Sequence, residues 1–222
     1  MTEKEKMLAG NLYNPTDHEL ARLHKEAIRL ADAYNRLPSE QTEAREEILH
    51  RLFPRAGKGL VMEGTVHADY GINTYMGEEC FFNFDTVILD CCPVHIGDRL
   101  MAGPGTQIVT PIHPLLAEER RIQDYPDGRH DLEYAQPIEI GNDVWLATRV
   151  TVCGGAKIGD GAVIGAGSVV LGEIPPYTFA AGVPAKVIRK LTEKDSVYQK
   201  YRGRVWIFRV GKNFRWSIST ID

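Results

Sequence analysis

His113 is one residue of this sequence whose type and position suit it to chemistry. An imidazole titrates near neutral pH, so it can take or give a proton there, and it can also bind a metal ion. His113 lies between Pro111 and Pro114, where a repeating segment stops and about 25 polar residues, 114–138, begin. Loops of that length are usually functional or disordered. We therefore expect a ligand or a neighbouring chain to reach His113.

Zinc binding is an alternative chemistry for the histidines. His67 and His95 could join His113, because prism-shaped enzymes related to carbonic anhydrases hold zinc with three histidines between subunits. The histidines of this chain lack the short paired spacing of those enzymes. We therefore expect no metal site.

The elements that must position His113 follow from a six-residue period between residues 140 and 174. The first position of each hexad is aliphatic and the fifth is small or β-branched, a spacing that neither a helix nor a single strand explains. Hexads fit a coil in which each supplies one short strand and one tight turn, so that three complete a turn of a triangular prism. The first positions are Ile140, Leu146, Val152, Ile158, Ile164 and Val170, and the fifth are Val144, Val150, Ala156, Ala162, Ser168 and Ile174.

An imperfect hexad frame precedes the regular one. It starts at Met76, slips by two residues at Val94 and His95, and resumes at Ile96. Counting three hexads to a turn puts His113 at the end of a turn, hence at a corner of the prism. The many glycines are expected to form turns at positive φ. The predicted turns are 76–93, 96–113, 140–157 and 158–175.

The first fifty or so residues have a helical pattern. Thr2 and Glu5 resemble a capping box, and Ser39 can start a later helix that Pro54 ends. Two amphipathic helices need a surface to cover, and the open first turn of the coil is the nearest one. Their apolar positions are Leu20, Leu23, Ala27, Leu30, Ala31 and Tyr34, then Ala44, Ile48, Leu49 and Leu52.

Composition limits the classes of function. The chain of 222 residues has a net charge of −4, which argues against wholesale nucleic-acid binding. Nothing resembles a membrane span, and the N-terminus lacks the apolar core of a secretory signal, so we expect a cytoplasmic protein. Of the four cysteines, Cys80 and Cys92 fall on fifth positions and are expected to be buried without disulfides.

Several segments resemble the maltose and galactoside O-acetyltransferases. The resemblance covers about residues 1–191 and implies a mainly β fold, a left-handed parallel β-helix with an N-terminal α-helical cap. Left-handedness comes from the resemblance alone, because parallel crossovers are nearly always right-handed. The segments are Met1–Tyr13, Asp69–Asn73, Phe82–Asp90, Ile112–Pro114, Ile140–Trp145 and Ala181–Lys186.

The resemblance implies an enzyme that transfers acetyl from acetyl-CoA to a sugar hydroxyl, built as a homotrimer with active sites between subunits and needing no metal. His113 matches the catalytic histidine, whose imidazole would take the proton of the attacking hydroxyl. The Thr148 N–H would stabilise the charge on the thioester oxygen. Asn83 matches a residue close to both substrates and could bind the acceptor or orient the histidine.

Further site residues follow from the same resemblance. Asp69, Asn83 and Cys91 match positions that contact the acceptor, although the galactoside enzyme has a carboxylate where this chain has Cys91, and a thiol is a poor partner for sugar hydroxyls. Leu171 and Gly172 replace a usual Thr-Lys pair. The acetyl-CoA positions are Asn83, Trp145, Thr148, Ala166, Leu171, Gly172, Lys186 and Arg189.

Three segments are therefore expected: a helical cap, 1–56; a β-helix, 57–191, with its loop 114–138; and an extension, 192–222. The extension could form a basic, aromatic β-hairpin that covers the last turn or meets an anionic surface. Two alternative functions remain open. The acceptor could be an antibiotic, an amino sugar or a polysaccharide precursor, and the prism could be a non-catalytic scaffold.

Overall fold

A computed structural model describes residues 1–200 of the chain, which divides into two compact units. The first unit is Met1–Arg189, and the second begins at Lys190. The described part of the second unit holds the short helices η1 (Glu193–Asp195) and α5 (Val197–Lys200). The hairpin expected around residues 205–218 lies outside the described residues. No helix within residues 1–200 is long and apolar enough to cross a membrane.

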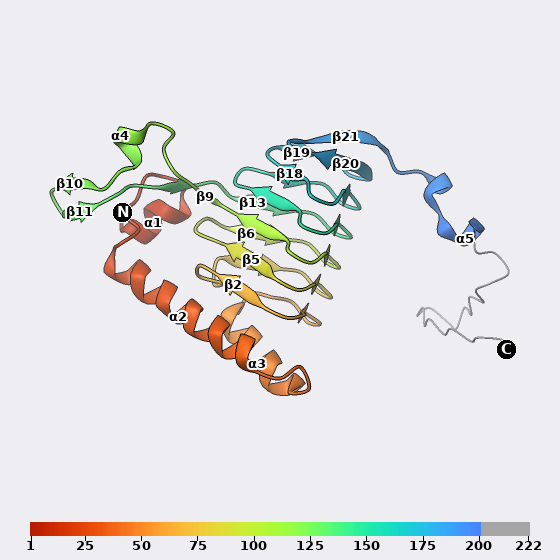
Figure 1. The fold of residues 1–222 in the computed structure, drawn as a ribbon, viewed down its shortest axis with the longest axis horizontal. Coiled ribbons are helices and arrows are strands. Elements are labelled where there is room, and N and C mark those ends of the chain that lie inside the picture. The colour runs from red at the N-terminus through yellow and green to blue at the C-terminus, as the bar shows by residue number, and fades with distance from the viewer. Residues whose placement is uncertain (201–222) are drawn as a thin grey trace. The chain divides into compact units, whose positions relative to one another are not determined.

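Most of the first unit is a coil of short strands that stack into three sheets, one on each face of a prism (Figure 1). Face 1 contains β3 (Thr74–Met76), β6 (Val94–Ile96), β13 (Ile138–Ile140), β16 (Lys157–Ile158) and β19 (Glu173–Ile174). Face 2 contains β1 (Val61–Met62), β4 (Phe81–Phe82), β7 (Met101–Ala102), β14 (Trp145–Leu146), β17 (Val163–Ile164), β20 (Thr178–Gly182) and β21 (Ala185–Lys190). Face 3 contains β2 (Val66–Ala68), β5 (Thr86–Leu89), β8 (Gln107–Val109), β15 (Thr151–Cys153) and β18 (Val169–Val170).

The hexad positions fill the interior of this coil, as predicted. All twelve first and fifth positions between Ile140 and Ile174 are buried, with at most 4% of any side chain exposed. Cys80 and Cys92 are also buried, and the four cysteines are free thiols. Strand pairs between successive turns are parallel, for example Ile140 with Ile158. The interior is therefore a stack of aliphatic layers that makes the coil rigid.

The length of a turn changes along the chain. Asn142 and Asp160, bonded across neighbouring turns, are 18 residues apart, which is three hexads. Thr65 and Asp85, bonded in the same way, are 20 residues apart. The predicted slip of two residues is confirmed, because Met76 pairs with Ile96. Val94 and His95 are part of strand β6, so the turn that starts at Met76 continues two residues beyond the predicted end at residue 93.

The extra residues gather at one corner, between face 3 and face 1. On face 3, Val87, Gln107 and Thr151 align on successive turns, and on face 1, His95, Glu139 and Lys157 align. The segment that joins face 3 to face 1 runs from residue 87 to 95, then from 107 to 139, then from 151 to 157. It is therefore longer in the early turns than in the last one. We call this the wide corner; it consists of residues 69–73, 90–93 and 110–137. The loop that follows His113 is the largest expansion of the same corner.

The long loop has structure of its own. It contains α4 (Ala117–Arg120) and a hairpin of β10 (Gln123–Tyr125) and β11 (Gly128–His130). Its two ends pair as β9 (Pro111–Ile112) with β12 (Tyr134–Ala135). Asn14 Nδ2 donates to Asp127 Oδ2 at 3.3 Å, which ties the hairpin to the N-terminal segment.

Helices α1 (Glu3–Leu8), α2 (His18–Arg36) and α3 (Thr42–Leu52) precede the coil (Figure 1). The Thr2–Glu5 capping box is present. Asn35 exchanges two hydrogen bonds of 2.9 Å with the backbone of Val66 on β2, and thereby satisfies the open edge of the coil. The helices therefore cap the first turn, as predicted.

The predicted start of the last cap helix is wrong. Ser39 lies in a turn closed by a 3.1 Å hydrogen bond from the Gln41 N–H to the Pro38 carbonyl oxygen, and α3 starts at Thr42. Gln41 occupies the N-cap position without a side-chain hydrogen bond. The helix is therefore held by packing, with Leu49 and Leu52 buried, more than by a cap.

Positive φ at the coil corners is not confined to glycine. Gly161 (φ 63°) aligns with Asp143 (φ 56°) and Arg99 (φ 56°) on successive turns. Arg99 Nε donates to Asp143 Oδ1 at 2.7 Å, so an ion pair joins two residues in this unfavourable conformation. Gly161 and nine other glycines have positive φ, as predicted, while Asp143 and Arg99 adopt the same conformation without being glycine.

Candidate active site

A pocket of about 660 Å³ opens at the wide corner and brings together three of the predicted site residues. His113, Asp69 and Cys91 line it, on three successive turns of the coil. The N-terminal segment contributes Tyr13, and helix α2 contributes His24. The His113 side chain is exposed in the single chain. The helical cap thus forms one wall of a pocket whose other wall is the coil.

Asp69 and Cys91 contact each other in this pocket. The Cys91 thiol donates a hydrogen bond to Asp69 Oδ2 at 3.4 Å, and His24 Nδ1 lies 3.6 Å from Asp69 Oδ1. Burial raises the pKa of Asp69, against the opposing effects of the Cys91 hydrogen bond and His24. Burial also raises the pKa of the Cys91 thiol well above its usual range. Cys91 is therefore a protonated, unreactive group that occupies one side of the Asp69 carboxylate.

Glu133 lines the same pocket, and the sequence did not single it out. Burial raises its pKa, and the nearby His113 opposes that effect. Its backbone pairs with Tyr13, which fixes its place at the end of the loop. The only sequence signal was the length of the loop that contains it. The structure thus adds a second partly buried carboxylate to the pocket that contains His113.

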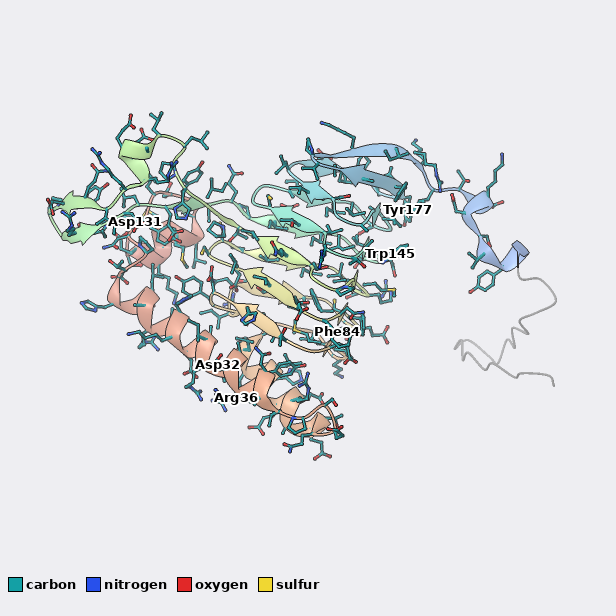
Figure 2. All side chains as sticks on the ribbon, viewed as in Figure 1. Asp32, Arg36, Phe84, Asp131, Trp145 and Tyr177 are labelled. Carbon is teal, nitrogen blue, oxygen red and sulfur yellow. The ribbon has the colours of Figure 1, made fainter. Side chains whose placement is uncertain are left out.

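Asn83 does not line this pocket. It follows β4 at the corner between faces 2 and 3, as Thr148 follows β14 and Ala166 follows β17. Figure 2 shows Phe84 and Trp145 along one edge of the coil, away from Asp131 of the long loop. The single chain therefore splits the predicted site between two corners of the prism.

The second corner offers unused backbone donors. Among residues 1–200, the structure records no acceptor for the N–H groups of Thr148 and Ala166, whereas the Gly167 N–H donates to the Thr148 carbonyl oxygen at 2.9 Å. Thr148 and Ala166 are exposed, and half of the Trp145 surface is exposed on the adjoining face. Free N–H groups beside an exposed aromatic ring can bind a polar, extended ligand.

The remaining predicted cofactor residues lie near the last turn. Leu171, Gly172 and Lys186 line a separate cavity of about 420 Å³. Arg189, also on β21, is exposed and does not line that cavity. The two other histidines of the zinc alternative lie elsewhere: His67 is on β2, and His95 is on β6, stacked on Tyr75 at 4.5 Å. Within residues 1–200, no three His, Cys, Asp or Glu side chains are grouped as metal ligands.

Fold and site together define a class of protein, the hexapeptide-repeat acyltransferases. The coil of six-residue units carries a histidine-containing pocket where the coil is interrupted, and free backbone donors at another corner. Family models agree with this assignment. Residues 6–57 match the maltose acetyltransferase hexapeptide capping motif, and residues 137–172 match the bacterial transferase hexapeptide model of six repeats.

Whole-length similarity names the family. Galactoside O-acetyltransferase of Escherichia coli is 33% identical over 89% of this chain and 94% of its own length. The crystal structure of a maltose O-acetyltransferase from Clostridium difficile 630 is 41% identical, with a TM-score of 0.80 over 87% of this chain and 99% of that one. A galactoside acetyltransferase in complex with coenzyme A is 31% identical, with a TM-score of 0.80 over 98% of this chain and 100% of that one.

The chain belongs to the maltose and galactoside O-acetyltransferase family. Its coil is the left-handed parallel β-helix of these acetyltransferases, as the resemblance predicted.

Proposed function

We propose that this protein transfers the acetyl group of acetyl-CoA to a hydroxyl of a sugar. The observation that carries the proposal is the pocket in which His113 lies with two partly buried carboxylates, Asp69 and Glu133. Carboxylates accept hydrogen bonds, so they suit a substrate whose many hydroxyl groups can donate them. Acetyl-CoA as donor is supported by the family and by a related structure that contains coenzyme A.

The reaction is a direct transfer. The acceptor hydroxyl attacks the thioester carbonyl carbon while His113 takes its proton, and the carbonyl oxygen gains negative charge. The Thr148 N–H, free within the described chain, donates to that oxygen. Collapse of the intermediate breaks the C–S bond, and the imidazolium returns its proton to the leaving sulfur. The products are an O-acetyl sugar and free coenzyme A.

Glu133 supports the base. Its negative charge stabilises the imidazolium that forms when His113 takes the proton, and the same interaction opposes the effect of burial on Glu133. Asp69 accepts hydrogen bonds from the acceptor and so orients the reacting hydroxyl toward His113. The general base contributes roughly 100- to 10,000-fold to the rate in enzymes of this kind.

The active form is a homotrimer with its active sites between subunits. Asn83, Trp145 and Thr148 occupy a different corner from His113, so a second copy has to supply them. Face 2 carries a column of exposed apolar side chains in register, Val61, Met101 and Trp145, with Phe84 exposed beside it. A neighbouring copy that covers this column brings its own wide corner to these residues.

The test is thiol release from acetyl-CoA with maltose, glucose and galactosides as acceptors. Replacement of His113 with Ala is expected to lower kcat by roughly 100- to 10,000-fold while the trimer persists in size-exclusion chromatography. His95→Ala is the matched control, because His95 is an exposed histidine on another face of the coil and is expected to leave kcat unchanged. A fully active His113→Ala variant would refute the mechanism.

A second acceptor class is favoured by Cys91. Its thiol donates a hydrogen bond to Asp69 Oδ2 and is itself a poor hydrogen-bonding partner for a sugar hydroxyl. The pocket is therefore less polar on this side. Acceptors with a less polar group at that position, such as an antibiotic or a polysaccharide precursor, are therefore the alternative. The same assay with a panel of such acceptors separates the two, since kcat/KM ranks them directly.

A further inference from the structure

Asp90 is a buried carboxylate that none of the preceding chemistry uses. It directly follows strand β5, and its side chain has 0% of its surface exposed. Its Oδ1 accepts hydrogen bonds from the N–H groups of Tyr70 and Gly71, both at 2.9 Å. Its Oδ2 accepts from the Asn73 N–H and from Thr74 Oγ1, both at 3.0 Å. All four donors belong to the preceding turn of the coil.

These bonds replace the regular strand pairing at the wide corner. Residues 69–73 belong to no strand, and they fold around the Asp90 side chain. The Asn73 side chain adds a fifth bond, from Nδ2 to the Asp90 carbonyl oxygen at 2.8 Å. A carboxylate with four donors keeps its charge more readily than burial alone would allow. Burial raises the pKa of Asp90, and the hydrogen bonds oppose that rise.

Asp90 adjoins both acceptor-binding residues through the chain. Asp69 immediately precedes the segment that Asp90 holds, and Cys91 immediately follows Asp90. Cys91 Sγ lies 3.4 Å from Asp69 Oδ2, so the two side chains meet across neighbouring turns. The Asp90 side chain therefore holds residues 70–74 against the next turn at the pocket, beside the backbone bond from the Asp69 N–H to the Ile88 carbonyl oxygen at 3.2 Å.

The connection continues to the turn that carries His113. The Cys92 N–H donates to Thr110 Oγ1 at 3.0 Å, and Thr110 Oγ1 donates to the Leu89 carbonyl oxygen at 2.8 Å. Thr110 is buried, and strand β9 with His113 follows it. Three successive turns are thus joined by buried side-chain hydrogen bonds, from Asp69 to the start of the catalytic segment.

We propose that Asp90 is a positioning residue that fixes the acceptor-binding side chains Asp69 and Cys91 relative to His113. It does not line the pocket and does not touch the acceptor. The proposal rests on the function proposed above, because it assigns Asp69 and Cys91 to the acceptor. The donor acetyl-CoA is expected to bind elsewhere, at Trp145, Thr148 and Ala166, so its binding does not depend on Asp90.

Asp90→Asn in the full-length protein tests this proposal. The amide keeps the shape of the carboxylate but turns a donor toward backbone N–H groups, so the 69–73 segment has to move. We expect KM for the acceptor to rise about 10-fold or more and KM for acetyl-CoA to stay within about twofold. A merely structural role would lower the amount of active enzyme, and therefore kcat, without this split between the two substrates.

Thr74→Val is the matched control. It removes one hydrogen bond to Oδ2 at the end of the segment remote from Asp69 and is expected to leave the acceptor KM within about twofold. If Asp90→Asn does not fold, Asn73→Ala replaces it; this variant removes only the bond from Nδ2 and is expected to raise the acceptor KM by a smaller factor.

The outcomes are distinct. An acceptor KM that is unchanged in Asp90→Asn, or that rises together with the KM for acetyl-CoA, overturns the positioning role while the proposed function stands. A wild-type protein that acetylates no acceptor of the panel overturns the proposed function, and the role of Asp90 with it.

Discussion

Tyr13 of the N-terminal segment and Glu133 of the long loop hold each other by two backbone hydrogen bonds. The Tyr13 N–H donates to the Glu133 carbonyl oxygen at 3.0 Å, and the Glu133 N–H donates to the Tyr13 carbonyl oxygen at 3.3 Å. This antiparallel bridge fastens the end of the loop to the helical cap. The bridge uses the backbone alone, and the Glu133 side chain interacts with both the Tyr13 side chain and His113.

Glu133→Gln is expected to lower kcat about 10-fold or more at neutral pH, because a neutral amide does not stabilise the imidazolium of His113. The backbone bridge to Tyr13 is unaffected by this change, so the melting temperature should stay close to that of the wild type. Steady-state kinetics measure kcat, and a thermal melt measures the melting temperature. A variant with wild-type kcat would show that Glu133 only shapes the loop.

Mixed trimers test whether the active site is shared between subunits. His113→Ala and Asn83→Ala are each expected to lose most activity, because each removes one side of the site. When the two inactive proteins are mixed under conditions that exchange subunits, about one quarter of the sites combine an intact His113 with an intact Asn83. We therefore expect about one quarter of the wild-type activity to return.

Two controls accompany that experiment. Mixing His113→Ala with Glu133→Ala should give no more than the average activity of the two variants, since both residues line the pocket of one chain. Mixing without subunit exchange should also restore nothing. If His113→Ala and Asn83→Ala fail to complement after exchange is confirmed, the shared site is ruled out.

The coil could be predicted from sequence because each hexad repeats the same pattern of inward-facing aliphatic and small residues. Ile140, Val152 and Ile164 all point inward for the same reason, the alternation of short strands and tight turns. The wide corner could not be predicted in this way. Its residues are held by the polar contacts of Asp90 and Thr110, which leave no hydrophobic period in the sequence.

The site was only partly predictable for a related reason. His113 marks the interruption of the repeat, and the family motifs pointed to Asp69 and Cys91. Glu133 reaches the pocket because Tyr13 pairs with it, and a contact between residues so far apart in the chain has no local signature. Ser39 illustrates the opposite error, since a good capping residue lies in the turn that precedes α3.

Gly172→Lys is expected to tighten the binding of acetyl-CoA. A Cβ atom at Gly172 meets nothing within 4 Å, so the side chain fits without strain. The cavity it enters already contains Lys186, and a second cation near the phosphates of the donor should lower KM for acetyl-CoA about two- to fivefold. Gly172→Ala, which adds the carbon without the charge, should change nothing. An effect that survives high salt would contradict the electrostatic explanation.

We expect His130 to make the stability of the hairpin of the long loop depend on pH. Its side chain is 4% exposed and stacks on Tyr125 at 4.5 Å. Nδ1 lies 2.7 Å from the Asp131 carbonyl oxygen, and Nε2 lies 3.1 Å from Asp127 Oδ1. Both partners are acceptors, so both ring nitrogens can donate only in the imidazolium. Although burial lowers the pKa of His130, its bonds to Asp131 and Asp127 raise it more.

The direction of the pH effect follows from that raised pKa. The contribution of His130 to hairpin stability is fully present below the ordinary histidine pKa of about 6.5 and is lost as pH rises through the folded value. The pKa of Asp127 is lowered, chiefly by its hydrogen bond from His130, so its contribution is lost only as pH falls below about 4. The hairpin is therefore expected to be most stable between about pH 4 and 6.5.

Hydrogen exchange of residues 123–130, corrected for the intrinsic rate at each pH, measures this effect. Protection in the wild type should fall as pH rises above about 6.5, while protection of the coil residues 158–174 stays constant. His130→Gln, which keeps one donor and cannot titrate, should remove the pH dependence. If this variant loses protection over the same range as the wild type, a group other than His130 controls the hairpin.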